Sequence, residues 1–181
     1  MKTLSLLIIA LMLTFTVVGY TQSPTLDTTN QKYQVVKGAK DHDELSQIIF
    51  TALKENDFAS LKKYIPGEEE ITYLKKTSSE RNKPFFHNLD EEQVKGRILS
   101  DFESIIQQGI SEQTNWSTVE LIDYQTRSCS IENIGCTVTL QTEDAKGIQR
   151  LYSYDAIRVK DRWFIFQNLK IEESLDKHSS N

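Results

Sequence analysis

Asp155 is the residue of this chain whose type and position could support general acid–base chemistry. It interrupts an alternating run of residues whose other members are Leu151, Ser153, Ile157 and Val159. Such alternation indicates one face of a β-strand. If that face points inward, burial would disfavour the ionised carboxyl and let it act as a general base. Two alternatives stay open: an ion pair with a cation such as Arg158, and a position on the exposed half of the strand.

Three further residues are candidates for ligand binding. Tyr154 lies on the opposite face of the strand that carries Asp155, and Tyr124, on an earlier predicted strand, can share that face. Their rings could stack against a ligand, although aromatic side chains on strands more often pack within the sheet. Gln167 is the polar residue in the otherwise apolar face of the last predicted strand. A buried amide needs hydrogen-bond partners, which either a ligand or a neighbouring backbone group can supply.

Cys129 and Cys136 are the two cysteines of the chain, and they flank a predicted turn at Glu132 and Asn133. A symmetric hairpin about this turn places the cysteines opposite each other, within reach of a disulfide. In an oxidising compartment such a pair is usually bridged, which stabilises the fold by about 2 to 3 kcal/mol in the chain-entropy account. Catalytic redox cysteines have a closer spacing, such as C-x-x-C, so the sequence predicts a structural disulfide.

The sequence predicts neither a metal site nor a cofactor. The three histidines, His42, His87 and His178, have no other histidine, cysteine or carboxylate at a recognisable metal-ligand spacing. The chain also lacks the G-x-S-x-G, H-E-x-x-H and glycine-rich phosphate-loop motifs.

Helical periodicity dominates the first half of the predicted domain. A helix of about 13 residues is expected after Asp41, ending at Asn56, and a shorter helical piece follows it. Glu68 begins a third candidate helix, where negative charge favours the helix start. The stretch 75–87 is polar and is expected to be irregular. Asp90 is a suitable N-cap for a helix of about 20 residues.

The second half changes to the two-residue period of β-strands. Four strands are expected, at 118–126, 134–142, 148–159 and 163–171. Connections this short join antiparallel neighbours, so the sheet is expected to be a meander. Helices followed by such a sheet predict an α+β fold in which the helices pack on one face of a curved antiparallel sheet.

The chain begins with the features of a secretory signal peptide: Lys2, an uncharged apolar run, and then small residues. The apolar run covers about 15 residues, whereas a helix that spans a bilayer needs about 20, so we expect cleavage rather than a retained anchor. No cysteine lies near the junction to accept a lipid. We therefore expect an exported, soluble protein, periplasmic or extracellular, with no membrane contact after cleavage.

The expected division of the chain is a signal peptide at 1–21, a linker at 22–39, a single α+β domain at 40–173 and a flexible tail at 174–181. Without Lys2, the 21 basic residues become 20 against 26 acidic ones, a net charge of −6. An acidic surface repels phosphate backbones, so nucleic acid is not expected to be a partner.

The segments DELSQIIFTALKENDFASLKKYIP and YDAIRVKDRWFIFQNLKI, with a long helix and a meander between them, resemble the nuclear transport factor 2-like superfamily. The resemblance is to its small exported members from Bacteroidetes-type bacteria, and it spans residues 40–173. It implies a cone-like α+β domain whose curved sheet and helices enclose a pocket. Some members use that pocket for isomerase, dehydratase, cyclase or epoxide hydrolase chemistry. Many others use the domain for binding or for dimerisation. No residue here aligns with the catalytic motifs of the enzymes, so the resemblance implies no activity by itself.

Two functional hypotheses follow. The first is a non-catalytic exported module that binds an unknown small molecule or protein through a sheet–helix pocket or a sheet face, with a homodimer as one such use. The alternative is a small pocket enzyme of the isomerase or dehydratase type with Asp155 as its general base.

Overall fold

The computed structural model describes residues 36–129 and 134–172. The features predicted elsewhere lie outside the described residues: the signal peptide at 1–21, most of the linker at 22–39, the tail at 174–181, and the turn at Glu132 and Asn133. Within the two described ranges, no helix is long and apolar enough to cross a membrane.

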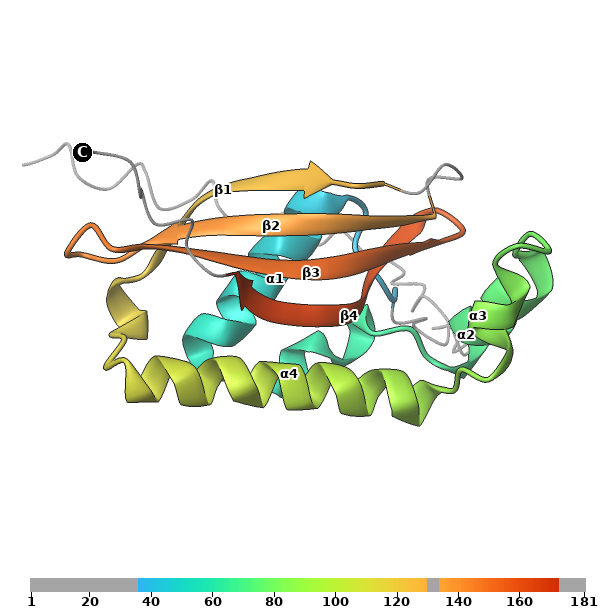
Figure 1. Cartoon of the computed structure of the whole chain (residues 1–181), viewed down its shortest axis with the longest axis horizontal. Coiled ribbons are helices and arrows are strands. Elements are labelled where there is room, and N and C mark those ends of the chain that lie inside the picture. The colour runs from blue at the N-terminus through green and yellow to red at the C-terminus, as the bar shows by residue number, and fades with distance from the viewer. Residues whose placement is uncertain (1–35, 130–133, 173–181) are drawn as a thin grey trace, which may run out of the picture. The chain divides into compact units, whose positions relative to one another are not determined.

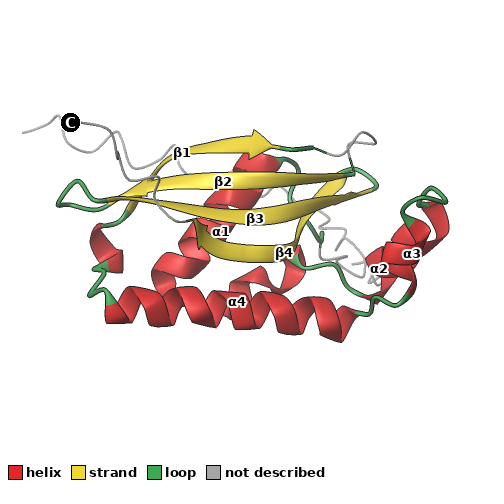
Figure 2. Ribbon diagram, viewed as in Figure 1, coloured by secondary structure: helices red, strands yellow, loops and turns green. Residues whose placement is uncertain are grey.

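Helices precede strands along the chain (Figure 1, Figure 2). The helical elements, including the short 3-10 helices η1 and η2, are α1 (His42–Glu55), η1 (Phe58–Tyr64), α2 (Glu68–Thr77), α3 (Lys83–His87), α4 (Glu91–Ser111) and η2 (Trp116–Thr118). The strands are β1 (Glu120–Arg127), β2 (Gly135–Glu143), β3 (Gln149–Val159) and β4 (Arg162–Glu172). The prediction of an α+β fold is confirmed.

Capping residues at both ends of α1 determine where the helix begins and ends. The Asp41 carboxylate accepts a hydrogen bond from the amide of Glu44 at 2.8 Å and so satisfies one of the free donors of the first turn. Asn56 ends the helix in the left-handed conformation, with φ 51°. The buried stripe of this helix includes Leu45, Ile49 and Leu53, which confirms the predicted helix after Asp41.

Helix α4 is capped in the same way, because the Asp90 carboxylate accepts from the amide of Gln93 at 2.8 Å. The helix is 21 residues long and lies along β4 (Figure 1). Its buried stripe consists of Val94, Ile98, Phe102, Ile105 and Ile106. The predicted long helix is thus confirmed.

The prediction of an irregular stretch at 75–87 is wrong, because α2 continues to Thr77 and α3 forms at Lys83–His87. Pro84 lies in the first turn of α3, where its fixed φ suits a helix and its missing N–H costs nothing. Phe86 anchors the turn in the core. A helix of five residues is too short to show an apolar period, so no periodic signal marks it in the sequence.

The sheet is an open antiparallel meander with the strand order β1-β2-β3-β4. This order confirms the predicted meander. Among the described residues, β1 pairs only with β2. The Tyr124 amide of this edge strand donates to the Asp123 carboxylate at 2.8 Å.

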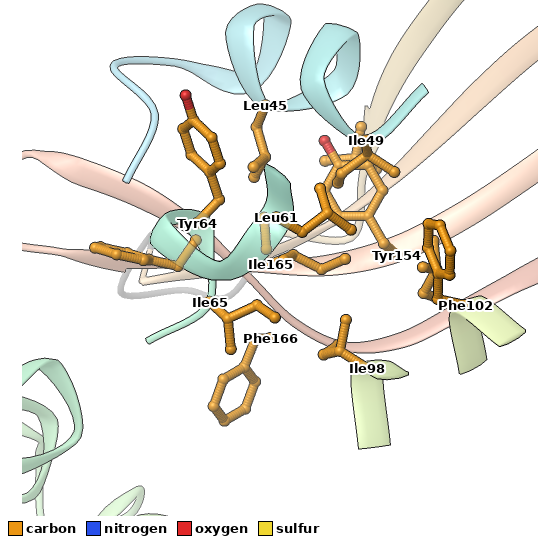
Figure 3. Packing of buried hydrophobic residues seen from close by; sticks show 14 of the residues in the cluster. Leu45, Ile49, Leu61, Tyr64, Ile65, Ile98, Phe102, Tyr154, Ile165 and Phe166 are labelled. Atoms are coloured by element: carbon orange, nitrogen blue, oxygen red, sulfur yellow. The ribbon is translucent and has the colours of Figure 1, made fainter. Parts of the chain in front are cut away.

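Helix α1 passes behind the sheet in Figure 1, and the face of β3 that meets it carries Tyr154. The Tyr154 side chain is fully buried, and its hydroxyl lies 3.0 Å from that of Ser46 in α1. Figure 3 shows the Tyr154 ring beside Ile49, among the apolar side chains of α1, η1 and α4. Since successive side chains of a strand alternate, Asp155 points to the face away from α1.

The packed domain begins slightly earlier than residue 40, where the sequence places its start. Ala39 is fully buried and forms an isolated antiparallel bridge with Trp163, and the Gly38 amide donates to the Lys63 carbonyl at 2.8 Å. The end of the predicted linker is therefore part of the fold.

We expect His42 to make the stability of the domain fall in mild acid. Its ring lies 4.0 Å from the Trp163 ring, between centroids, and its Nδ1 is buried without a partner among the described residues. Burial lowers the pKa of His42, although Asp41 opposes the shift. The unfolded chain therefore takes up this proton more readily than the fold does, and stability is lost as the pH falls below about 6.5.

His42→Phe keeps an aromatic ring against Trp163 and removes the titratable imidazole. Urea denaturation at pH 7, 6 and 5 should show a smaller loss of unfolding free energy in this variant than in the wild type. His87→Phe, at an exposed site on α3, is the matched control and should follow the wild type. An unchanged pH dependence in His42→Phe would contradict the prediction.

Candidate functional site

The strand register brings Asp155 between two polar side chains of neighbouring strands. Asp155 pairs with Thr137 of β2 on one side and with Gln167 of β4 on the other. The Thr137 hydroxyl donates to Asp155 Oδ1 at 2.7 Å, and the Gln167 side-chain amide donates to Oδ2 at 3.2 Å. The Asn168 side-chain amide also donates to Oδ2, at 2.6 Å. One half-buried carboxylate thus accepts three hydrogen bonds from neutral donors.

Irregular pairing between β3 and β4 makes this arrangement possible. The register shifts on both sides of Asp155, and Asn168 has a positive φ of 56°. In a regular strand, Gln167 and Asn168 would point to opposite faces of the sheet. The local irregularity lets both amides reach the same carboxylate, as bulges often do when they redirect a side chain.

Asp155 lines a pocket of about 280 Å³ between α3 and one end of the sheet. Figure 1 shows α2 and α3 at that end, to the right of the strands. The described lining residues come from α3 and its approach, from β2 and the residues before it, from β3 and from β4. They include Phe85, Phe86, Cys136, Thr137, Phe166 and Gln167.

Three phenylalanines form the apolar wall of the pocket. The Phe85 ring centroid lies 5.1 Å from that of Phe86 and 5.9 Å from that of Phe166, and Phe86 and Phe166 are 6.3 Å apart. Phe86 and Phe166 are buried in the core, whereas Phe85 remains 54% exposed. Phe85 therefore offers an aromatic surface held in place by two fixed rings.

The predicted disulfide between Cys129 and Cys136 is confirmed, and it lies at this pocket. Cys136 is buried and contributes to the lining, and Ser128, next to Cys129, contributes as well. The bond ties the start of β2 to the chain that leaves β1. It therefore fixes one wall of the pocket.

The structure brings together only part of the predicted site. Gln167 contacts Asp155, as described above. Tyr154 instead belongs to the core, where burial raises the pKa of its hydroxyl; this placement argues against the predicted ligand contact. Tyr124 is half-buried and lines a separate hollow of about 280 Å³ on the sheet, together with Thr139 and Leu151.

Sequence reasoning missed Thr137, Asn168 and the phenylalanine wall. The doublet Phe85-Phe86 in an otherwise polar stretch was a usable signal, because two adjacent aromatic residues rarely both face water. The roles of Thr137 and Asn168 depend on the strand register and on the irregular pairing, which the sequence pattern does not show.

The described lining of the pocket offers a charge, hydrogen-bond acceptors and an aromatic wall. Asp155 is the single ionisable side chain among the described residues of its lining, because Cys136 is in the disulfide. None of the ion pairs between described residues involves Asp155. The described residues also contain no cluster of three or more side chains able to hold a metal ion. No protein-family model, curated protein or solved structure matches this chain.

Proposed function

We propose that this protein is a non-catalytic binding module whose pocket at α3 takes a small molecule. One observation carries the proposal: a carboxylate fixed by three neutral donors stands beside an aromatic wall that includes the exposed ring of Phe85. An apolar lining with a few convergent polar groups is the usual composition of a small-molecule site. The volume of about 280 Å³ suits a ligand of modest size.

The alternative, an enzyme with Asp155 as general base, has less support. Dehydration needs, besides a base, an acid that protonates the leaving hydroxyl group. The described lining residues supply no such partner. The arrangement favours a carboxylate that orients a ligand over one that removes its proton.

We further propose that the module is exported and nuclear transport factor 2-like. The leader at 1–21 and the disulfide support export to an oxidising compartment, whether periplasm or medium. Helices followed by a four-stranded antiparallel meander support the superfamily. N-terminal sequencing of the protein recovered from culture fractions tests export: a mature start after residue 21 supports it, and an intact Met1 in the cytosolic fraction contradicts it.

Fragment screening by ¹H–¹⁵N NMR tests the binding function. We expect apolar fragments to shift the backbone amides of the pocket strands, and Phe85→Ala to weaken these fragments by about fivefold or more, because the ring supplies much of the apolar contact. Ile122→Ala is the matched control, since Ile122 is similarly exposed, at 52%, but lies on β1 outside the pocket. Equal effects of the two substitutions, or no shifts at the pocket, would reject the proposal.

A further inference from the structure

We propose that the ligand of this pocket is a small organic cation: a primary ammonium group on an apolar, preferably aromatic, body. This inference rests on the proposed binding function and adds the chemical class of the ligand. It follows from three properties of the pocket: the state of the Asp155 charge, the remaining hydrogen-bond capacity of its oxygens, and the position of the phenylalanine rings.

The negative charge of Asp155 is held in place by hydrogen bonds, and no cation among the described residues neutralises it. Its partners Thr137, Gln167 and Asn168 are all uncharged donors. Among the described residues, no ion pair includes this carboxylate. A half-buried carboxylate with no counter-ion among the described residues favours a cation over a neutral group of the same shape, because opposite charges attract.

The hydrogen bonds also leave room for one more donor. An ionised carboxylate has about four lone-pair positions. Oδ2 accepts from Gln167 and Asn168, whereas Oδ1 accepts from Thr137 alone. A ligand N–H can therefore bind Oδ1 without displacing any protein donor. Hydrogen bonds between charged groups are the stronger kind, so an ammonium gains more at this position than a hydroxyl does.

The aromatic wall accounts for the rest of such a ligand. Phe85 is exposed, and its ring is fixed by the neighbouring rings of Phe86 and Phe166. An aromatic ring can pack on this surface, and the faces of the phenylalanines also attract a cation within about 6 Å. An anionic ligand is repelled, because its negative charge would lie beside that of Asp155.

Three probes of nearly equal shape test the inference on the intact mature protein: 2-phenylethylamine, 2-phenylethanol and phenylacetate, titrated at pH 7 and followed by ¹H–¹⁵N NMR. We expect the amine to shift the amides around 135–137, 155–157 and 166–167 and to bind about tenfold tighter than the alcohol, with phenylacetate weakest. Raising NaCl from 50 to 500 mM should weaken the amine several-fold and leave the alcohol unchanged.

Asp155→Asn should remove the preference for the amine, because the side-chain amide carries no charge. Asp123→Asn is the matched control, because Asp123 lies on β1 in the separate hollow, and it should keep the preference. Equal binding of amine and alcohol by the wild type, or a preference that survives Asp155→Asn, overturns the inference but leaves the binding function standing. If no probe shifts the pocket amides, both proposals fail.

Discussion

Gly38→Ala is expected to lower the free energy of unfolding by about 2 to 4 kcal/mol. Gly38 has φ +74°, a conformation that costs an L-residue about 1 kcal/mol or more. A Cβ at this position would lie 2.7 Å from Phe164 Cζ and 2.9 Å from Arg162 Cβ. The chain cannot easily move away, because the Gly38 amide is bonded to Lys63 and Ala39 is bridged to Trp163.

Urea denaturation of the purified variant measures this loss directly. Gly147→Ala is the matched control: its φ is +77°, but nothing lies within 4 Å of the added Cβ, so it carries the backbone cost without the collision. We expect Gly147→Ala to lose about 1 kcal/mol. If both variants lose the same amount, the contact with Phe164 is relieved by a small shift and the steric part of the prediction is wrong.

The helices and strands could be predicted because local signals specify them. Asp41 and Asp90 cap their helices through hydrogen bonds that their side chains accept from the backbone amide three positions later. The residue types that form such caps can be recognised in the sequence. The strands follow from alternation and from short connections. Helix α3 escaped prediction because it depends on burying Phe86 against distant parts of the chain, not on a local pattern.

The orientation of β3 could not be read from its alternation. Both of its faces contain apolar residues, and the sequence does not state which face meets the helices. The structure decides this through a contact 108 residues apart, in which Ser46 of α1 supplies the hydrogen bond that the buried Tyr154 hydroxyl requires. Tyr154 is therefore a core residue, and Asp155 lies on the other face.

The pocket itself depends on features that only the folded chain has. Asp155 and Gln167 were identifiable as polar exceptions in apolar strands, and the structure joins them. The contribution of Asn168 requires the irregular pairing of β4. The contribution of Phe85 requires α3 to pack at the end of the sheet, about 70 positions away from Asp155 in the sequence. Single-residue reasoning finds the polar members of such a site but not the surface that completes it.

Replacing both cysteines, by Cys129→Ser with Cys136→Ser, is expected to lower the free energy of unfolding by about 2 to 3 kcal/mol. The two residues are seven positions apart, so the disulfide closes a short loop and removes part of the entropy of the unfolded chain. Cys136 is also buried, and a serine hydroxyl there loses its solvation. Urea denaturation of the double variant and of the wild type with and without reductant measures the loss; the reduced wild type should lose slightly less than the variant, because it keeps the Cys136 thiol in place of a serine hydroxyl. Equal stability in all three would contradict the prediction.

The same substitution should weaken ligand binding, because the disulfide holds a wall of the pocket. Cys136 pairs with Ala156 next to the Thr137–Asp155 pair, so fraying at the disulfide loosens the strand that carries the Thr137 hydroxyl. We expect 2-phenylethylamine to bind several-fold more weakly to the double variant at a temperature where the domain remains folded. Far-UV circular dichroism checks the fold in the same sample. Unchanged affinity despite the lost stability would mean that the sheet alone fixes Thr137, and that the disulfide stabilises the domain without organising its site.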